Sequence, residues 1–176
     1  LGQLAESIPK PMIQIGGKPI LWHIMKIYSH YGFNEFIIAL GVKGEIIKNY
    51  FYNYAILNNN FSIDFNSGDI SYHDYNTERN WKVTLVDTGI NTLKGGRIKR
   101  LESHINDEVN LLTYGDGLSN INIKKLLAFH IKQNTIGTVT AVHPPARFGE
   151  LILYKNKVIS FQEKVQTKND WINGGF

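Results

Sequence analysis

A lysine held between two prolines is the first residue whose setting suits chemistry. The segment Pro9-Lys10-Pro11-Met12 precedes Gly16-Gly17-Lys18-Pro19. The prolines fix the backbone around Lys10, which lowers the entropy lost when its ammonium group is placed on a ligand. Lys10 is therefore suited to binding a phosphate, although a surface lysine in a proline-rich loop has the same sequence.

One aspartate follows a predicted strand and has glycine on either side. Asp116 comes after the apolar run Val109–Tyr114, between Gly115 and Gly117. The glycines leave room for phosphates and for other backbone segments. A carboxylate in such a place can ligate Mg²⁺, which usually takes one or two protein carboxylates with phosphate oxygens and water. A simple Asp-Gly turn is the alternative.

Three further polar segments could contact a ligand. A glycine-bearing loop around Thr88-Gly89 and Thr92–Arg97 can offer amide N–H groups and the donor fork of Arg97. Glu163-Lys164 can contact a sugar hydroxyl and a phosphate, and the final segment 171–176 (WINGGF) suits a sugar with polar edges and apolar faces. Ordinary turns and exposed Glu-Lys pairs have the same appearance.

The hydrophobic pattern predicts a scaffold that brings such loops together. Apolar residues recur at helical spacing over 18–31, 43–57, 96–105 and 122–133. Short apolar or alternating runs predict strands over 35–40, 81–86, 109–114 and 137–143, a hairpin over 150–154 and 158–163, and small strands within an irregular stretch, 58–80. The alternation predicts one α/β domain with a mainly parallel sheet and helices on both faces.

In such a sheet, ligands bind beyond the carboxyl ends of the strands, because loops and helix N-termini gather there. The predicted strands place three segments at that edge: Gly41, Asp87–Gly89 and Gly115–Gly117. The candidate site is therefore expected where these segments meet.

The composition excludes several functional classes. The chain has no cysteine, which excludes disulfides and thiolate zinc sites, and its six histidines do not show zinc-ligand spacing. The 19 basic and 15 acidic residues give a net charge of +4, but the basic residues are scattered, so phosphorylated substrates are expected and nucleic acid is not. No stretch approaches the roughly 20 apolar residues that cross a bilayer, so no membrane partner and a cytoplasmic location are expected.

Nine segments, taken in chain order, resemble one family. They are PKPM, GGKPILWHIMKIYSHYG, LGVKG, VTLVDTG, TLKGGRIKR, TYGDG, TAVHPPARFGEL, FQEK and WINGGF. Together they resemble the glucose-1-phosphate cytidylyltransferases of the sugar-nucleotidyltransferase superfamily. The likeness runs through nearly all of the 176 residues.

The resemblance implies a Rossmann-like nucleotidyltransferase fold, Mg²⁺ as cofactor, and the reaction of CTP with glucose 1-phosphate to give CDP-glucose and diphosphate. The product would feed deoxysugar and surface polysaccharide (O-antigen) synthesis. The resemblance assigns catalysis to Lys10 and Asp116, with Asp116 as the Mg²⁺ ligand. It assigns nucleotide contacts to Lys10, Thr92, Arg97 and Gly115, and sugar-phosphate contacts to Glu163, Lys164, Asn173 and Gly174.

The chain departs from the family pattern at both ends. The family begins with a strand and a glycine-rich loop that ends in Gly-Thr-Arg, and an ungapped alignment places Leu1 just after that arginine. At the other end, Phe176 precedes the region where the family carries a second Mg²⁺-binding aspartate. Residues 1–176 are therefore expected to form a partial nucleotidyltransferase domain that is inactive by itself.

Two alternatives remain at this point. One is a sugar-1-phosphate nucleotidyltransferase that uses another nucleotide, and the other is an inactive fragment that binds a nucleotide or a sugar phosphate. The aromatic, asparagine-rich stretch 50–75 could also be a contact between subunits of a homo-oligomer.

Overall fold

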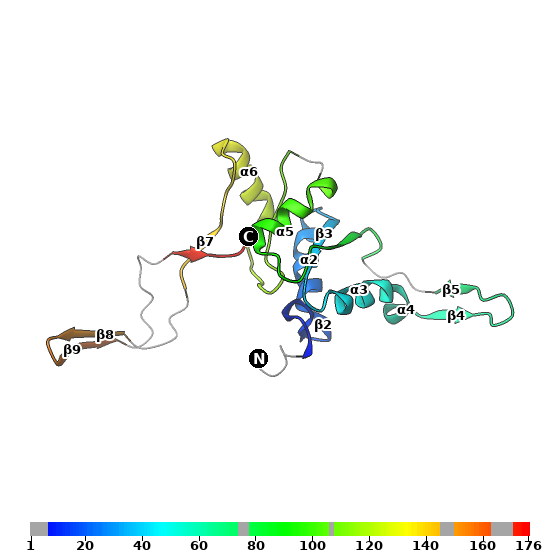
Figure 1. Ribbon diagram of the computed structural model, residues 1–176, viewed down its shortest axis with the longest axis horizontal. Helices are drawn as coiled ribbons and strands as arrows, with labels where there is room; N and C mark the ends of the chain where they lie inside the picture. The colour runs from blue at the N-terminus through cyan, green and yellow to red at the C-terminus, as the bar shows by residue number, and fades with distance from the viewer. Residues whose placement is uncertain (1–6, 74–77, 106–107, 145–149, 163–170) are drawn as a thin grey trace. The chain divides into compact units, whose positions relative to one another are not determined.

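The structure is a computed structural model that describes residues 7–73, 78–105, 108–144, 150–162 and 171–176 (Figure 1). The chain divides into two compact units. The first unit comprises residues 1–110 and 115–125, and the second comprises residues 111–114 and 126–176. The part of the chain that the structure describes contains no helix long and apolar enough to cross a membrane.

A parallel pair of strands forms the centre of the first unit. Strands β3 (Glu35–Leu40) and β6 (Lys82–Asp87) pair in parallel, and their last residues, Leu40 and Asp87, lie opposite one another. The two carboxyl ends therefore meet at one edge, as predicted. Both predicted strands are confirmed, with β6 displaced by one residue from the expected range.

Helix α2 (Ile20–His30) packs against this pair because its apolar residues share one face. Its buried residues are Leu21, Ile24, Met25 and Tyr28. The helix begins directly after Pro19, and the turn that follows it uses Gly32 at a φ of +95°, a backbone conformation that favours glycine. The core joins Leu21 and Met25 to buried residues of three other elements, namely Met12, Leu40 and Ile47.

The predicted helix 43–57 forms as two helices rather than one. Helix α3 (Gly44–Tyr52) ends at Asn53, and helix α4 (Tyr54–Asn58) begins directly after it. The side chain of Asn53 donates to the carbonyl of Asn49 at 3.0 Å and to its Oδ1 atom at 2.7 Å. The break falls at Asn53, a residue type whose side chain bonds the neighbouring backbone and is therefore common at helix ends.

Two short antiparallel hairpins complete the first half of the chain. The 3-10 helix η1 (Lys10–Met12) leads into β1 (Gln14–Ile15) and β2 (Lys18–Pro19), which pair across Gly16 and Gly17, both at positive φ. Strands β4 (Phe61–Ile63) and β5 (Ile70–Tyr72) pair within the stretch where small strands were predicted.

The predicted helix 96–105 is shorter than expected. Helix α5 (Lys94–Arg100) starts two residues earlier and ends at Arg100, and a separate 3-10 helix, η2 (Glu102–His104), follows Leu101. Helix α6 (Ile123–Gln133) forms as predicted, and Asn122 caps it by accepting a hydrogen bond from the backbone N–H of Lys125 at 3.0 Å.

The predicted α/β class with a parallel sheet is confirmed, and the described residues contain two strands of that parallel sheet. The described residues form five two-stranded sheets, of which β3–β6 alone is parallel. The predicted strand 109–114 is not formed, and the predicted strand 137–143 is reduced to β7 (Ala141–Val142), which pairs with β10 (Ile172–Asn173). An apolar run specifies an extended segment, but a strand also needs a hydrogen-bonded neighbour.

The second unit holds the predicted hairpin near the C-terminus. Strands β8 (Glu150–Tyr154) and β9 (Lys157–Gln162) pair antiparallel with an irregularity between Ile152 and Leu153. Among the described residues of this unit, none is a buried hydrophobic side chain. The core that positions the candidate residues described next therefore belongs to the first unit.

Candidate functional site

The structure brings together two candidate residues that lie over a hundred positions apart. The ammonium Nζ of Lys10 lies 3.9 Å from the carboxylate Oδ2 of Asp116, and the side chains are 69% and 42% exposed. The 3-10 helix η1 presents Lys10, and Pro11 beside it packs on Gly115, where an added Cβ would lie 3.0 Å from the proline ring. Gly115 therefore lets the Asp116 loop approach the proline segment closely.

This pair is loosely held and accessible. A contact of 3.9 Å between two exposed side chains contributes little to stability, because water screens the charges. Both groups can therefore turn to a ligand at low cost. Together they offer one cation and one carboxylate on the same surface, which is the minimum needed to hold a phosphate and a divalent cation side by side.

The second cluster lies at the carboxyl ends of β3 and β6. The Thr88 hydroxyl is fully buried and donates to the carbonyl of Leu40 at 2.7 Å. Nη1 of Arg97 donates to that carbonyl at 2.8 Å and to the Thr88 hydroxyl at 2.6 Å, while Nη2 donates to the carbonyl of Ile90 at 3.2 Å. Arg97 also covers Gly41, where an added Cβ would lie 2.6 Å from Nη2.

Arg97 therefore links the carboxyl ends of β3 and β6 through hydrogen bonds to Leu40 and Thr88. A guanidinium has five N–H donors, so these bonds do not exhaust its capacity to bind a ligand. Two of the segments expected at this edge, Gly41 and Asp87–Gly89, do meet here.

Thr92, another candidate residue, is held by Arg100. Nη1 of Arg100 donates to the Thr92 hydroxyl at 2.8 Å and to the carbonyl of Thr88 at 2.6 Å. Arg100 was not singled out from the sequence. The available signal was its spacing: Arg97 and Arg100 are three residues apart on α5, so their side chains lie on neighbouring parts of one helix face.

The remaining candidates lie elsewhere. Asn173 and Gly174 belong to the second unit, where Asn173 donates to the hydroxyl of Tyr114 at 3.0 Å and Gly174 donates to the carbonyl of Thr140 at 2.8 Å. An added Cβ on Gly174 would lie 3.0 Å from Val142 and 3.1 Å from the Thr140 carbonyl oxygen, so a side chain there would crowd the strand pair. Glu163 and Lys164 lie outside the described residues.

The Asp116 carboxylate fits a magnesium ion whose other ligands come from the substrate phosphates and from water. No group of three or more His, Cys, Asp or Glu side chains that could hold a metal occurs among the described residues. Asp116 offers a single exposed carboxylate. Mg²⁺ commonly takes one or two carboxylates and completes its shell with phosphate oxygens and water, so Asp116 is adequate only when phosphates are present.

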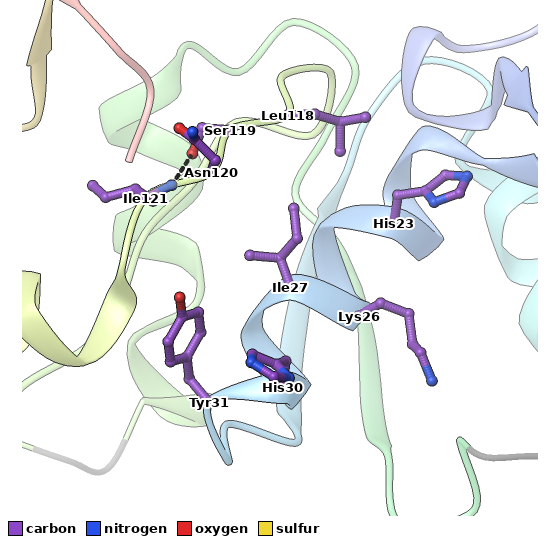
Figure 2. Close-up of a pocket in the computed structure, with 9 residues that line it drawn as sticks. All are labelled: His23, Lys26, Ile27, His30, Tyr31, Leu118, Ser119, Asn120 and Ile121. Carbon is purple, nitrogen blue, oxygen red and sulfur yellow. Dashed lines mark hydrogen bonds between the residues drawn. The ribbon is translucent and has the colours of Figure 1, made fainter.

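One hollow in the described part of the first unit does not coincide with these residues. It has a volume of about 520 Å³ and lies between α2 and the loop that follows Asp116, lined by Ile27, His30 and Tyr31 on one side and by Leu118–Ile121 on the other. Figure 2 shows Ile27 facing this loop, whereas Lys26 points away from it. The loop is closed by a bond from the Ile121 N–H to the Ser119 hydroxyl at 3.3 Å.

A separate polar cluster has a structural role. The Glu78 carboxylate is buried and accepts hydrogen bonds from Lys26 at 2.8 Å and from the Tyr54 hydroxyl at 3.2 Å. Burial, followed by the charge of Glu78, raises the pKa of Tyr50 to about 12. Burial is also the main cause that raises the pKa of Tyr54 above its usual value. These groups are neutral phenols around a buried anion and show no tuning toward acid-base work near neutral pH.

Comparison with known proteins identifies the family of the chain. The family model described as nucleotidyl transferase matches residues 1–176. The probable glucose-1-phosphate cytidylyltransferase of Bacillus subtilis (strain 168) is 44% identical over 176 residues, which cover all of this chain and 68% of that protein. The glucose-1-phosphate cytidylyltransferase of Salmonella typhi is 46% identical over 169 residues, which cover 96% of this chain and 65% of that protein.

A solved structure shows the same fold. The crystal structure of HddC from Yersinia pseudotuberculosis superposes with a TM-score of 0.57 at 23% identity, covering 96% of this chain and 65% of that one. The chain thus spans about two thirds of the length of each of these three proteins. The fold is the Rossmann-like nucleotidyltransferase fold, and the chain belongs to the nucleotidyl transferase family.

Proposed function

We propose that the protein at its natural full length transfers a cytidylyl group from CTP to glucose 1-phosphate, forming CDP-glucose and diphosphate. The observation that carries the proposal is the exposed pair of Lys10 and Asp116, which places a cation and a carboxylate 3.9 Å apart on one surface. The choice of CTP and glucose 1-phosphate rests on the relatives that are 44% and 46% identical and carry that activity in their names.

The reaction needs no nucleophile from the protein. A phosphate oxygen of glucose 1-phosphate attacks the α-phosphorus of CTP, a new P–O bond forms, and the bond to the β-phosphate oxygen breaks as diphosphate leaves. The protein has to align two anionic reactants and stabilise the negative charge that grows on the phosphates. The candidate residues are accordingly Lys, Arg and Asp.

The exposed ammonium of Lys10 would bind the nucleotide phosphates, with Gly115 providing close approach of the backbone. Asp116 would hold Mg²⁺ together with phosphate oxygens, and the bound ion would neutralise charge on the reacting phosphates. Thr92 and Arg97 would contact the nucleotide from the ends of β3 and β6.

The sugar side of the site rests on the resemblance. Glu163, Lys164, Asn173 and Gly174 would contact glucose 1-phosphate, and a role for the product in deoxysugar and surface polysaccharide (O-antigen) synthesis belongs to the same proposal. The cytoplasmic location stays a prediction.

The test is release of diphosphate by the full-length protein with glucose 1-phosphate, Mg²⁺ and each of CTP, UTP, dTTP, ATP and GTP in turn. The proposal expects the highest kcat/KM with CTP. A clear preference for another nucleotide would reassign the base while keeping the reaction class. Nucleotide binding without release from any of the five would support the inactive binding protein instead.

A further inference from the structure

The hairpin of β4 and β5 has two chemically different faces. The strand register forms two apolar pairs, Phe61 with Tyr72 and Ile63 with Ile70. The pair between them is Ser62 with Ser71. Because side chains alternate across a strand, the four apolar residues share one face and the two serines share the other. The face of Phe61, Ile63, Ile70 and Tyr72 is called the apolar hairpin face below.

The apolar hairpin face is uncovered. Phe61, Ile63 and Ile70 are 40–42% exposed, and no residue of this face belongs to the core around α2 or packs against it. A two-stranded hairpin alone in water is only marginally stable, and an apolar face of a sheet is normally buried against another layer. The face is therefore available for contact with another molecule.

The charge around the face narrows the kind of partner. Residues 49–63 contain no charged side chain. The carboxylates of the hairpin are Asp64 and Asp69, and the Asp64 N–H donates to the carbonyl of Asp69 at 3.0 Å, so this pair continues the ladder on the serine face. A face without cations does not attract nucleic acid or an anionic membrane. Aromatic residues with few charges are typical of the centre of a protein–protein interface.

A second copy of this chain fits the face because the face is complementary to itself. The aromatic pair lies at the base of the hairpin, and the aliphatic pair lies next to the turn. When two hairpins pack face to face in opposite directions, each aromatic pair lies on the aliphatic pair of the other copy, so larger side chains meet smaller ones. The same arrangement keeps the acidic turns of the two copies at opposite ends, which avoids repulsion between their carboxylates.

The surroundings of the hairpin can enlarge such a contact. A stable protein–protein interface buries roughly 800 Å² per partner, which is more than the face of a short hairpin supplies. Leu57 and Phe65 precede and follow β4 in the sequence and are 70% and 89% exposed. These side chains are therefore available to extend the buried area.

We propose that the apolar hairpin face packs against the same face of a second copy of this chain across a two-fold axis, with the two hairpins running in opposite directions. The proposal assigns a subunit contact within the stretch 50–75 to specific residues. It is independent of the proposed cytidylyl transfer, because assembly is measured without turnover.

Sedimentation velocity of the full-length protein over a range of concentrations measures the association. Ile70→Asp places a carboxylate in the apolar hairpin face of both copies, so the dissociation constant should rise at least about a hundredfold, because a charge is then buried without a partner. Ser71→Asp is the matched control, since it adds the same charge at the next residue of β5 but on the serine face, and the Ser71 hydroxyl bonds to none of the described residues. The control should change the constant by less than about threefold.

Spin labels test the orientation of the two hairpins. Residues 1–176 contain no cysteine, so an introduced cysteine is the single label site within this region, and the wild type carried through labelling is the control. Ser71→Cys places a label near the two-fold axis, and Asn66→Cys places one at the turn. The shortest distance between copies, measured by double electron–electron resonance, should be smaller for Ser71→Cys than for Asn66→Cys. This comparison decides if Ile70→Asp fails to fold.

The outcomes separate the possible occupants of the face. Weaker association in Ile70→Asp alone, with the shorter distance at residue 71, supports the proposal. A wild type that sediments as a monomer at every concentration refutes it. Binding of that monomer to phosphatidylcholine vesicles, lost in Ile70→Asp, would then assign the face to a membrane, and no binding would leave a different protein. Equal masses of Ile70→Asp and Ser71→Asp, or a longer distance at residue 71 than at residue 66, also refute it.

Discussion

At the scale of single residues, exposure separates the side chains available to a ligand from those committed to the fold. The side chains of Lys10 and Asp116 are 69% and 42% exposed, whereas Thr88 is fully buried. A charged side chain that is exposed and contributes little to stability is a candidate for binding a ligand. This contrast predicts different outcomes for substitutions at the two places.

Asp116→Asn should remove activity without loss of stability. The amide keeps the shape of the side chain but loses the charge that would hold Mg²⁺, so diphosphate release should fall at least about a hundredfold, on the scale of an electrostatic contribution to phosphoryl transfer. The melting temperature should stay within about 2 °C, because an exposed ion pair is worth about 0–1 kcal/mol.

Glu102→Gln is the matched control, because Glu102 is another exposed carboxylate paired with a lysine, Lys99, at 2.7 Å. It should leave both activity and melting temperature unchanged. Full activity of Asp116→Asn would remove Asp116 from the site, and a large fall in melting temperature would show that its role is structural.

Part of this site was predictable from residue types and spacing. The prolines around Lys10 and the glycines around Asp116 led to both residues, and the structure places them together. Arg100 was not predictable, because a basic residue near a helix end is common and its reach back to Thr88 depends on the conformation of the Gly89 loop.

At the scale of secondary-structure elements, the pair β3–β6 depends on a buried hydrogen-bond cluster at its carboxyl end. The Thr88 hydroxyl donates to the carbonyl of Leu40 and accepts from Arg97. Thr88→Val replaces the hydroxyl with a methyl group of similar size. Because a buried partner then loses its bond, the free energy of unfolding should fall by about 1–3 kcal/mol.

Urea unfolding followed by circular dichroism measures this loss. Thr84→Val is the control on the same strand, since the Thr84 hydroxyl bonds to none of the described residues, and it should change the free energy of unfolding by less than about 0.5 kcal/mol. Equal effects of the two substitutions would show that the cluster at Thr88 does not stabilise the strand pair.

Tyr50 on α3 should make the stability depend on alkaline pH. Its pKa is raised to about 12, first by burial and then by the charge of Glu78. In the unfolded chain the phenol ionises near pH 10, as an unperturbed tyrosine does. The unfolded state therefore loses its proton first, so the contribution of Tyr50 is complete below about pH 10 and is lost as the pH rises toward 12.

Tyr50→Phe should remove this part of the alkaline loss. At neutral pH the substitution should be neutral or slightly stabilising, because the Tyr50 hydroxyl is buried without a hydrogen-bond partner among the described residues. The measurement is urea unfolding at pH 8, 9.5, 10.5 and 11. Tyr52→Phe is the control, because Tyr52 lies on the same helix and is 88% exposed. A stability of Tyr50→Phe that falls as steeply as that of the wild type would contradict the expectation.

The sequence predicted the helices and strands that depend on their own hydrophobic pattern. It did not predict the elements that depend on pairing with another segment. The apolar stripe of α2 and the continuous apolar run of β3 are local patterns, and both elements formed within two residues of the predicted limits. The run 109–114 is also largely apolar, but no strand pairs with it in the described residues. The predicted helix 43–57 is divided at Asn53, which the apolar spacing does not mark.

At the scale of the whole molecule, family membership and fold rest on the entire chain, whereas the activity is a proposal. The family model matches residues 1–176, and these residues span 65–68% of the two named relatives. The described residues form two compact units, and the candidate residues Lys10, Thr92, Arg97 and Asp116 all belong to the first. The first unit therefore carries the proposed contacts to the nucleotide and the metal ion.

The most direct measurement is ³¹P nuclear magnetic resonance of the full-length protein with CTP and glucose 1-phosphate, with Mg²⁺ and then with excess EDTA. CDP-glucose and diphosphate should appear in equal amounts with Mg²⁺, and neither should appear with EDTA. Formation of CMP and diphosphate without CDP-glucose would show hydrolysis in place of transfer, and unchanged CTP in the presence of Mg²⁺ would contradict the proposed activity altogether.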